Sequence, residues 1–132
     1  MKKLAAILTL VLMFSGLAIP QTPPPDQILS TFVAKASSWA TVDLVPNSTD
    51  MSFNTLTVYA GTPSVGCDTL VQLMDWHTGA MSYFVYLGAG GTSSFQTIVF
   101  TVPAGDNVAV VVSTTGTCTT PAANLNIHAL YH

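Results

Sequence analysis

The sequence predicts an all-β fold: an antiparallel β-sandwich, jelly-roll or immunoglobulin-like, with about eight strands after an N-terminal signal peptide. Short runs rich in β-branched and aromatic residues recur roughly every 10 to 15 residues, divided by Gly, Pro, Asn and Asp. Apart from the apolar leader, apolar residues do not recur at helical spacing over any window of eleven or more residues. Several runs instead alternate apolar and polar side chains, as strands with one buried face do.

Each expected strand consists of residues that favour strands and stops where turn-forming residues begin. In chain order, the strands and the turns that end them are 31–34; 39–45, before Pro46-Asn47-Ser48; 53–59, before Gly61-Thr62-Pro63; 69–74, before His77-Thr78-Gly79; 81–87, before Gly88-Ala89-Gly90-Gly91; 95–102, before Pro103-Ala104-Gly105-Asp106; 108–113, before Thr114-Thr115-Gly116; and 125–131.

Three of these segments carry additional information. Alternation in 125–131 places Leu125, Ile127, Ala129 and Tyr131 on one face, which predicts that this face is buried. The run 108–113 is apolar on both faces, which is typical of a central strand covered on both sides or of a strand that meets another subunit. The Pro-Ala-Gly-Asp turn before it predicts a hairpin with 95–102, because Pro and Gly supply the two dihedral angles that a tight turn needs.

Residues 1–20 have the three parts of a secretory signal peptide. Lys2 and Lys3 precede an uncharged run of 16 residues, Leu4 to Ile19, and Pro20 follows. A membrane-spanning helix needs about 20 apolar residues, so we expect cleavage, with an uncleaved anchor as the alternative. Membrane contact is expected only in that alternative. Residues 21–30 are expected to form a Pro-rich linker, and 31–132 a single β-sandwich domain.

The chain contains two cysteines, Cys67 and Cys118, and their separation fits neither a CxxC motif nor a zinc-finger pair. An even number of cysteines in an exported chain predicts a disulfide bond between them. The expected location is therefore extracellular or at the cell surface, with the periplasm as the alternative compartment. Asn47-Ser48-Thr49 also matches the acceptor sequence for N-linked glycosylation.

Charge is scarce. From residue 26 onward the chain carries one basic side chain, Lys35, against six aspartates, and it has no Arg or Glu anywhere. Binding to nucleic-acid phosphates depends on Lys and Arg, so nucleic acid is excluded as a partner, and the same reasoning excludes attachment to an anionic membrane surface.

The sequence suggests no catalytic residues, no metal ligands and no cofactor. No Ser lies in a G-x-S-x-G elbow, and the glycine-rich segment 88–91 leads into no expected helix. The aspartates fall singly in or beside expected turns, where Asp ordinarily caps backbone N–H groups. His128 and His132 are four residues apart on a strand, about 13 Å, too far to share one ion. We therefore expect a protein that is not an enzyme.

Two functions remain. A surface made of neutral residues favours an exported structural or assembly module that associates with copies of itself through neutral β faces or edges. The alternative is a module that binds a glycan or another surface ligand. Its candidate ligand-binding residues are Trp76, Tyr83 and Tyr86, because Tyr and Trp combine a flat apolar face with a polar edge.

Overall fold

The computed structural model describes residues 25–37 and 39–132. The expected signal peptide and the first residues of the expected linker lie outside this range. The described residues form an all-β structure of eight strands without a helix. The strands are β1 (Gln27–Lys35), β2 (Trp39–Pro46), β3 (Met51–Thr62), β4 (Asp68–Asp75), β5 (Val85–Leu87), β6 (Ser93–Val102), β7 (Asn107–Thr115) and β8 (Ala123–Tyr131).

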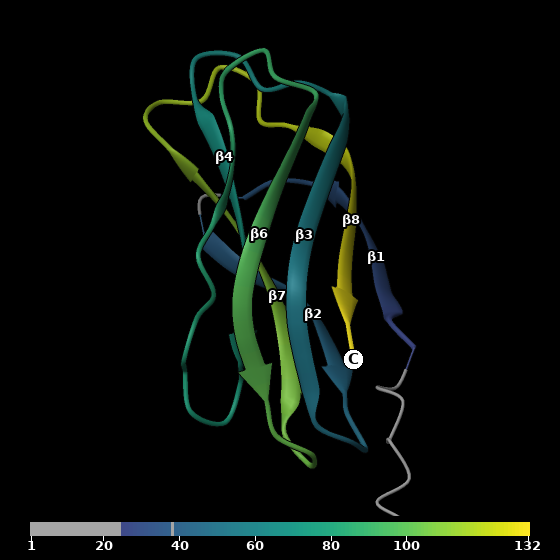
Figure 1. Ribbon diagram of the computed structural model, residues 1–132. Helices are drawn as coiled ribbons and strands as arrows, with labels where there is room; N and C mark the ends of the chain where they lie inside the picture. Colours follow the sequence, from purple (N-terminus) through teal and green to yellow (C-terminus); the bar gives the residue numbers. More distant parts are fainter. Residues whose placement is uncertain (1–24, 38) are drawn as a thin grey trace, which may run out of the picture.

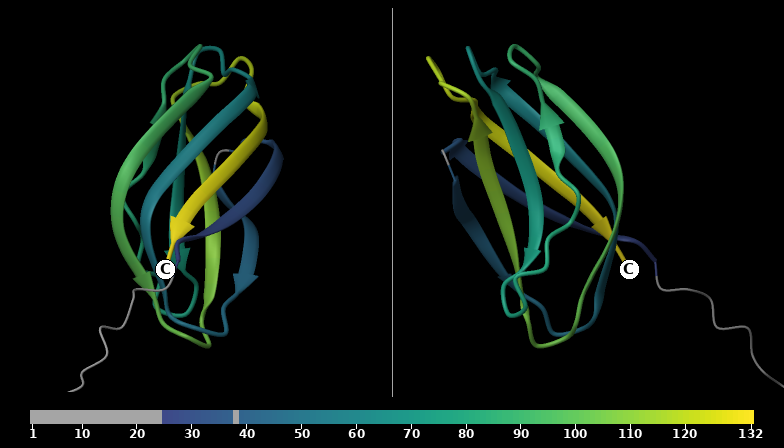
Figure 2. Two further views of the ribbon diagram at one scale, coloured as in Figure 1. Left: turned by 45° about the vertical axis from the view of Figure 1, so that its right-hand side comes forward. Right: turned by 90° about the vertical axis from the view of Figure 1, so that its left-hand side faces the viewer.

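The strands form two antiparallel sheets of four strands each (Figure 1). The first, which we call sheet A, has the order β1-β8-β3-β6, and sheet B has the order β2-β7-β4-β5. Two views rotated about the vertical axis show the sheets as two layers, with β6, β3, β8 and β1 in one of them (Figure 2). Consecutive strands mostly lie in different sheets, so most connections cross from one layer to the other.

Two expected boundaries are wrong. Residues 27–30, expected in the linker, belong to β1, where Gln27 pairs with Tyr131 and Ser30 pairs with His128. The expected strand 81–87 is reduced to β5, three residues long, preceded by an isolated bridge between Met81 and Met74. In both cases pairing with another strand sets the boundary, and the residue preferences of the segment alone do not predict that pairing.

The expected hairpin between 95–102 and 108–113 is also wrong. The turn itself forms, with Gly105 at φ 90° and the Asp106 N–H bonded to the Pro103 carbonyl at 3.3 Å. Its flanking strands do not pair: β6 lies at the edge of sheet A, and β7 lies between β2 and β4 in sheet B. β7 is buried from Val108 to Val112, which bears out its expected central position.

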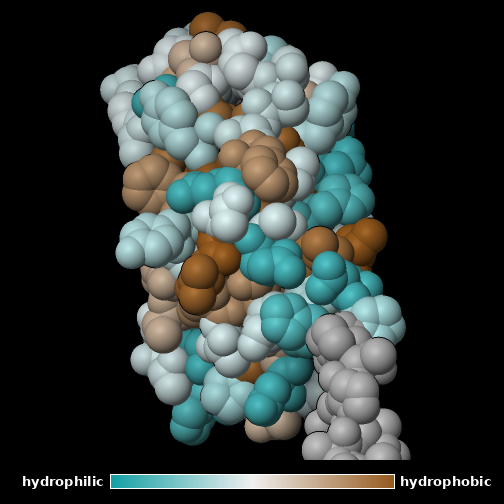
Figure 3. Space-filling view, in the orientation of Figure 1, coloured by the Kyte–Doolittle hydropathy of each residue, from teal (hydrophilic) through white to brown (hydrophobic). Residues whose placement is uncertain are grey.

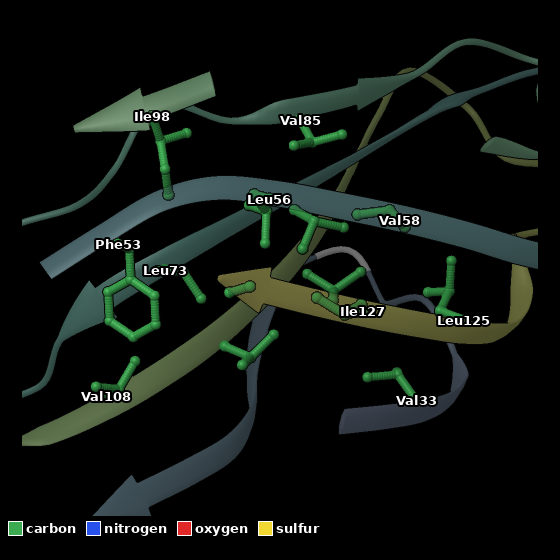
Figure 4. Packing of buried hydrophobic residues seen from close by; sticks show 14 of the residues in the cluster. Val33, Phe53, Leu56, Val58, Leu73, Val85, Ile98, Val108, Leu125 and Ile127 are labelled. Atoms are coloured by element: carbon green, nitrogen blue, oxygen red, sulfur yellow. The ribbon is translucent and has the colours of Figure 1, made fainter. Parts of the chain in front are cut away.

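The inner faces of both sheets contribute to one hydrophobic core (Figure 4). On β8 the buried residues are Leu125, Ile127 and Ala129, as the alternation predicts, and Tyr131 packs against the same cluster. Residues from β1, β3, β4, β5, β6 and β7 also contribute to it, among them Val33, Leu56, Val58, Leu73, Val85, Ile98 and Val108. Burying a Leu, Ile or Val side chain contributes about 1.5–3 kcal/mol relative to leaving it exposed, so this core is the main source of stability.

None of the described residues belongs to a helix, so none lies in a helix long and apolar enough to cross a membrane.

The predicted disulfide is present. Cys67 and Cys118 are bonded, with Cα atoms 4.8 Å apart. Cys67 directly precedes β4 and Cys118 follows β7, and these strands are neighbours in sheet B with Asp68 opposite Thr115. The bridge therefore links the start of β4 to the segment after the end of β7, at one end of sheet B.

Replacing Cys67 with Ser should lower the free energy of unfolding by roughly 2–5 kcal/mol, because the unfolded chain loses a closed loop. Denaturant unfolding of both forms measures the difference. Thiol titration of the unfolded, unreduced protein should find no free thiol; two free thiols would contradict the bridge.

Asn47 fastens the turn between β2 and β3 to the turn between β6 and β7. It is 8% exposed, and its Nδ2 donates to the carbonyls of Pro103 at 2.6 Å, Thr49 at 3.2 Å and Val102 at 3.5 Å. Its backbone N–H donates to Asp106, and its carbonyl accepts from the Gly105 N–H. The nitrogen of the glycosylation acceptor sequence is therefore engaged inside the folded domain.

Asn47→Ala removes these donors from one buried and two partly buried hydrogen bonds, so we expect a loss of about 1–3 kcal/mol in the free energy of unfolding. Ser48→Ala, at the exposed neighbouring position, serves as the control and should stay within about 0.5 kcal/mol of the wild type. Equal unfolding midpoints for the two variants would contradict the role assigned to Asn47.

Candidate functional site

The outer face of sheet A presents a neutral surface that extends over four strands. Alternate residues of a strand point to opposite faces, so the residues between the buried ones point outward. On β1 and β8 the outward residues are Ile28, Ser30, Phe32, Asn126, His128 and Leu130; on β3 and β6 they are Thr55, Thr57, Tyr59, Phe95, Thr97 and Val99. We call these twelve residues the outer face.

The strand register arranges the outer face in rows across four strands. In the central row, Ser30 of β1 lies opposite His128 of β8, which lies opposite Thr57 of β3, which lies opposite Phe95 of β6. One neighbouring row joins Phe32, Asn126 and Tyr59 in the same way. Apolar and neutral polar side chains thus alternate over the surface.

Large apolar side chains on the outer face are strongly exposed to solvent. The exposed fraction is 63% for Phe95, 58% for Phe32, 65% for Ile28 and 89% for Val99. Figure 3 shows this side of the molecule, with hydrophobic patches separated by hydrophilic and intermediate ones. Isolated exposed apolar residues are common on proteins, but several on one sheet are a feature of interaction surfaces.

None of the twelve outer-face residues is Lys, Arg, Asp or Glu. Two are titratable: His128 in the central row and the phenol of Tyr59. Lys35 lies at the end of β1, and Asp26 precedes the beginning of β1. The face therefore carries no fixed charge, and the imidazole of His128 is the one histidine side chain on it.

The outer face of sheet B differs because part of it is covered. Met74, Ala109 and Val111 form a small buried cluster on this side. Next to it, residues 80–82 run along β4, where the Ala80 carbonyl accepts from the Asp75 N–H and the Ser82 N–H donates to Leu73. Sheet A has no comparable covering segment among the described residues.

The sheet edges differ in how well they resist pairing with another strand. β1 carries Lys35, β2 contains Pro46 and a bulge near Thr41, and β5 has three residues. β6 is ten residues long and contains neither a charge nor a proline. Its register against β3 shifts near Val99, which leaves Ser93–Thr97 as a regular, uncharged stretch at an open edge.

The three candidate ligand-binding aromatics are exposed but do not form one cluster. Trp76 is 50% exposed, Tyr83 73% and Tyr86 52%. Tyr86 lies opposite Leu70 of β4, whereas Trp76 follows the other end of that strand, six residues and therefore about 20 Å away. Trp76, Tyr83 and Tyr86 are therefore spread out along the β4–β5 side of sheet B.

Tyr86 has a polar neighbour at its tip. A hydrogen bond to the Asp68 carboxylate, partial desolvation and the negative charge of Asp68 all raise the pKa of the Tyr86 phenol above its ordinary value. Asp68 also accepts from the Ala89 N–H at 3.1 Å and from the Thr115 hydroxyl at 3.3 Å. Tyr86 is therefore oriented by Asp68, which also accepts a hydrogen bond from the turn that follows β5.

Asp50 and Asp75 accept hydrogen bonds from backbone N–H groups, as their turn positions predict. Asp50 accepts from the Ala104 N–H, and the buried Asp75 accepts from the N–H groups of His77 and Thr78. Burial alone would raise the pKa of Asp75, but the hydrogen bonds that Thr78 and His77 donate to its carboxylate outweigh it and hold that pKa below its ordinary value.

The three histidines lie in different places. His77 is in the turn after β4, His128 is on the outer face, and His132 has its Nδ1 atom 3.8 Å from an oxygen of Asp26. Within residues 25–37 and 39–132, no group of three or more His, Cys, Asp or Glu side chains is placed to hold a metal ion.

The outer face of sheet A was not identified from the sequence as a site. Alternation along β8 turns His128 away from the buried residues. The same rule applied to β6 turns Phe95, Thr97 and Val99 outward. The rows that join these residues depend on pairing between strands far apart in the sequence, which alternation does not supply.

No protein-family model matches the chain, and no curated protein matches it. Several solved virus structures align with it at low similarity. For the acid-stable capsid of Helicobacter pylori bacteriophage KHP30, the TM-score is 0.48 and the identity 16%, over 80% of this chain and 86% of that one. For infectious bursal disease virus, Gx strain, the values are 0.39 and 12%, over 88% of this chain but 36% of that one. For the virus-like particle of Macrobrachium rosenbergii extra small virus, they are 0.33 and 18%, over 89% and 90%.

Proposed function

We propose that this protein is an exported, non-enzymatic structural module that assembles with copies of itself through the outer face of sheet A. We also infer that its two sheets form a β-sandwich of the jelly-roll type. The strand orders β1-β8-β3-β6 and β2-β7-β4-β5 favour this type, because an immunoglobulin fold divides its strands differently between the sheets.

The observation that carries the proposal is the chemistry of the outer face. Ile28, Phe32, Phe95 and Val99 are each more than half exposed, and no charged residue accompanies them on the face. Soluble monomers usually intersperse Lys, Arg, Glu and Asp over such a surface. Interface cores are instead depleted in charge and enriched in aromatic residues.

A second copy of the chain is the occupant that this surface fits best. The face offers a charged partner no opposite charge, whereas a second neutral face meets it without burying an unpaired ion. Four strands at about 4.8 Å spacing and nine residues at about 3.3 Å each give a footprint of about 20 Å by 30 Å. That area approaches the ~800 Å² per partner of a standard protein interface.

The open edge of β6 supplies a further contact. A strand added there would pair with Ser93–Thr97 and continue sheet A, as in other β-strand additions. The Cys67–Cys118 bridge supports export, because disulfides persist mainly in oxidising compartments. We place the module at the cell surface or in the extracellular space, with the periplasm as the alternative.

Sedimentation velocity of the purified protein over a concentration series at neutral pH tests the assembly. The wild type should sediment as a species larger than a monomer, or as long assemblies visible by electron microscopy. Phe95→Lys should shift the equilibrium toward monomer by at least about tenfold, because a Lys covered by the contact has no carboxylate partner on the opposing face.

Tyr83→Lys is the matched control, since it places the same charge at another strongly exposed aromatic, on the other sheet. It should assemble like the wild type. A wild type that is monomeric at all concentrations, or two variants that dissociate equally, would overturn the assignment of this face.

Binding of a neutral glycan is the second candidate function, favoured by the exposure of Trp76, Tyr83 and Tyr86. Their spacing suits an extended chain of sugar rings better than a single ring. A glycan that binds there should change the tryptophan fluorescence of the wild type, and Tyr83→Ala should weaken its affinity by about tenfold, as loss of a stacking contact does. Ile28→Ala, on sheet A, should leave the affinity unchanged. A glycan panel without any fluorescence change would remove this candidate.

A further inference from the structure

We propose that His128 makes the assembly through sheet A dependent on pH, holding copies together at neutral and alkaline pH and releasing them in mild acid. This inference rests on the proposed function and names the regulation of the same surface.

His128 lies on an inner strand of sheet A, within the outer face. β8 is an inner strand of sheet A, with β1 on one side and β3 on the other. His128 is exposed between Ser30 and Thr57, in the same row as Phe95. A second copy that covers the outer face must therefore cover this imidazole too.

The groups that face His128 offer no negative charge. β1 contributes Ser30 with Ile28 and Phe32 beside it, and β3 contributes Thr57 with the neutral phenol of Tyr59 one row away. β6, beyond β3, contributes Phe95 and Thr97. The Asp26 and His132 pair lies at the end of the sheet, about 13 Å along β8 from His128, and Lys35 lies at the opposite end of β1.

The face of a second copy has the same composition, so it brings no carboxylate either. Because an isologous contact pairs each surface with itself, it contains two copies of His128. A protonated imidazole in this contact would lose its water and gain no counter-ion, which disfavours the charged form. Association therefore requires both imidazoles to be neutral.

The direction of the pH effect follows from linkage. The separated copies bind protons that the assembled pair excludes, so association is complete above the range in which histidine titrates and weakens as the pH falls through it. Each imidazole that must lose its proton to enter the contact raises the dissociation constant about tenfold for every pH unit below that range. The contact contains two such imidazoles, so their effects multiply. Between pH 8 and pH 5 we expect the dissociation constant to rise by roughly 10²–10³-fold.

Sedimentation velocity at pH 8 and pH 5 tests this, with circular dichroism at both pH values as a check that the strands remain folded. The wild type should be assembled at pH 8 and dissociated at pH 5. His128→Gln, which stays neutral, should remain assembled at both, and His128→Lys, which stays charged, should be dissociated at both. His77→Gln and His132→Gln, which lack the other two imidazoles, should respond like the wild type.

The outcomes separate the two proposals. A wild type assembled equally at both pH values, or a folded His128→Gln that dissociates at pH 5 like the wild type, overturns the role of His128 while leaving the assembly intact. A wild type that is monomeric even at pH 8 overturns the assembly, and the regulation with it.

Discussion

The shared apolar core between the inner faces of the two sheets is the constraint on which the rest of the structure depends. Strand geometry leaves little choice once the core is specified: burying Leu125, Ile127 and Ala129 on β8 turns Asn126 and His128 outward. In most proteins the outward positions hold many charged residues. Here the chain has few to place, and the outer face of sheet A is filled by Thr, Ser, Asn, aliphatic and aromatic residues instead. The neutral surface is thus a direct result of the core and the composition together.

The parts of the fold that depend on local sequence could be predicted. Alternation predicted the buried face of β8, and the two-sided apolar run indicated either an interior strand or a strand that meets another subunit for β7, of which the structure shows the first. The disulfide followed from the number of cysteines and the expected compartment. Sheet membership across the Pro103–Asp106 turn could not be predicted, because the same turn geometry can join paired strands or strands in different layers. The sheet to which β7 belongs is decided by its burial between β2 and β4, two strands that lie far from it in the sequence.

The candidate surface was harder to predict for the same reason. Its central row joins Ser30, His128, Thr57 and Phe95, four residues that only the pairing of distant strands brings side by side. The sequence favoured Trp76, Tyr83 and Tyr86 because Tyr and Trp combine a flat apolar face with a polar edge. All three are exposed, yet they are spread along one side of sheet B, since residues near in sequence separate quickly along an extended strand.

The pairing of Gln27 with Tyr131 brings the two ends of the folded domain to the same place, with Asp26 beside His132 (Figure 1). Domains with adjacent ends tolerate insertion and circular permutation. This one could be grafted into a surface loop of a host protein through short joints, without stretching either polypeptide. It could also be reopened elsewhere after Asp26 and His132 are joined, for example between Gly88 and Gly91, away from the grafting point.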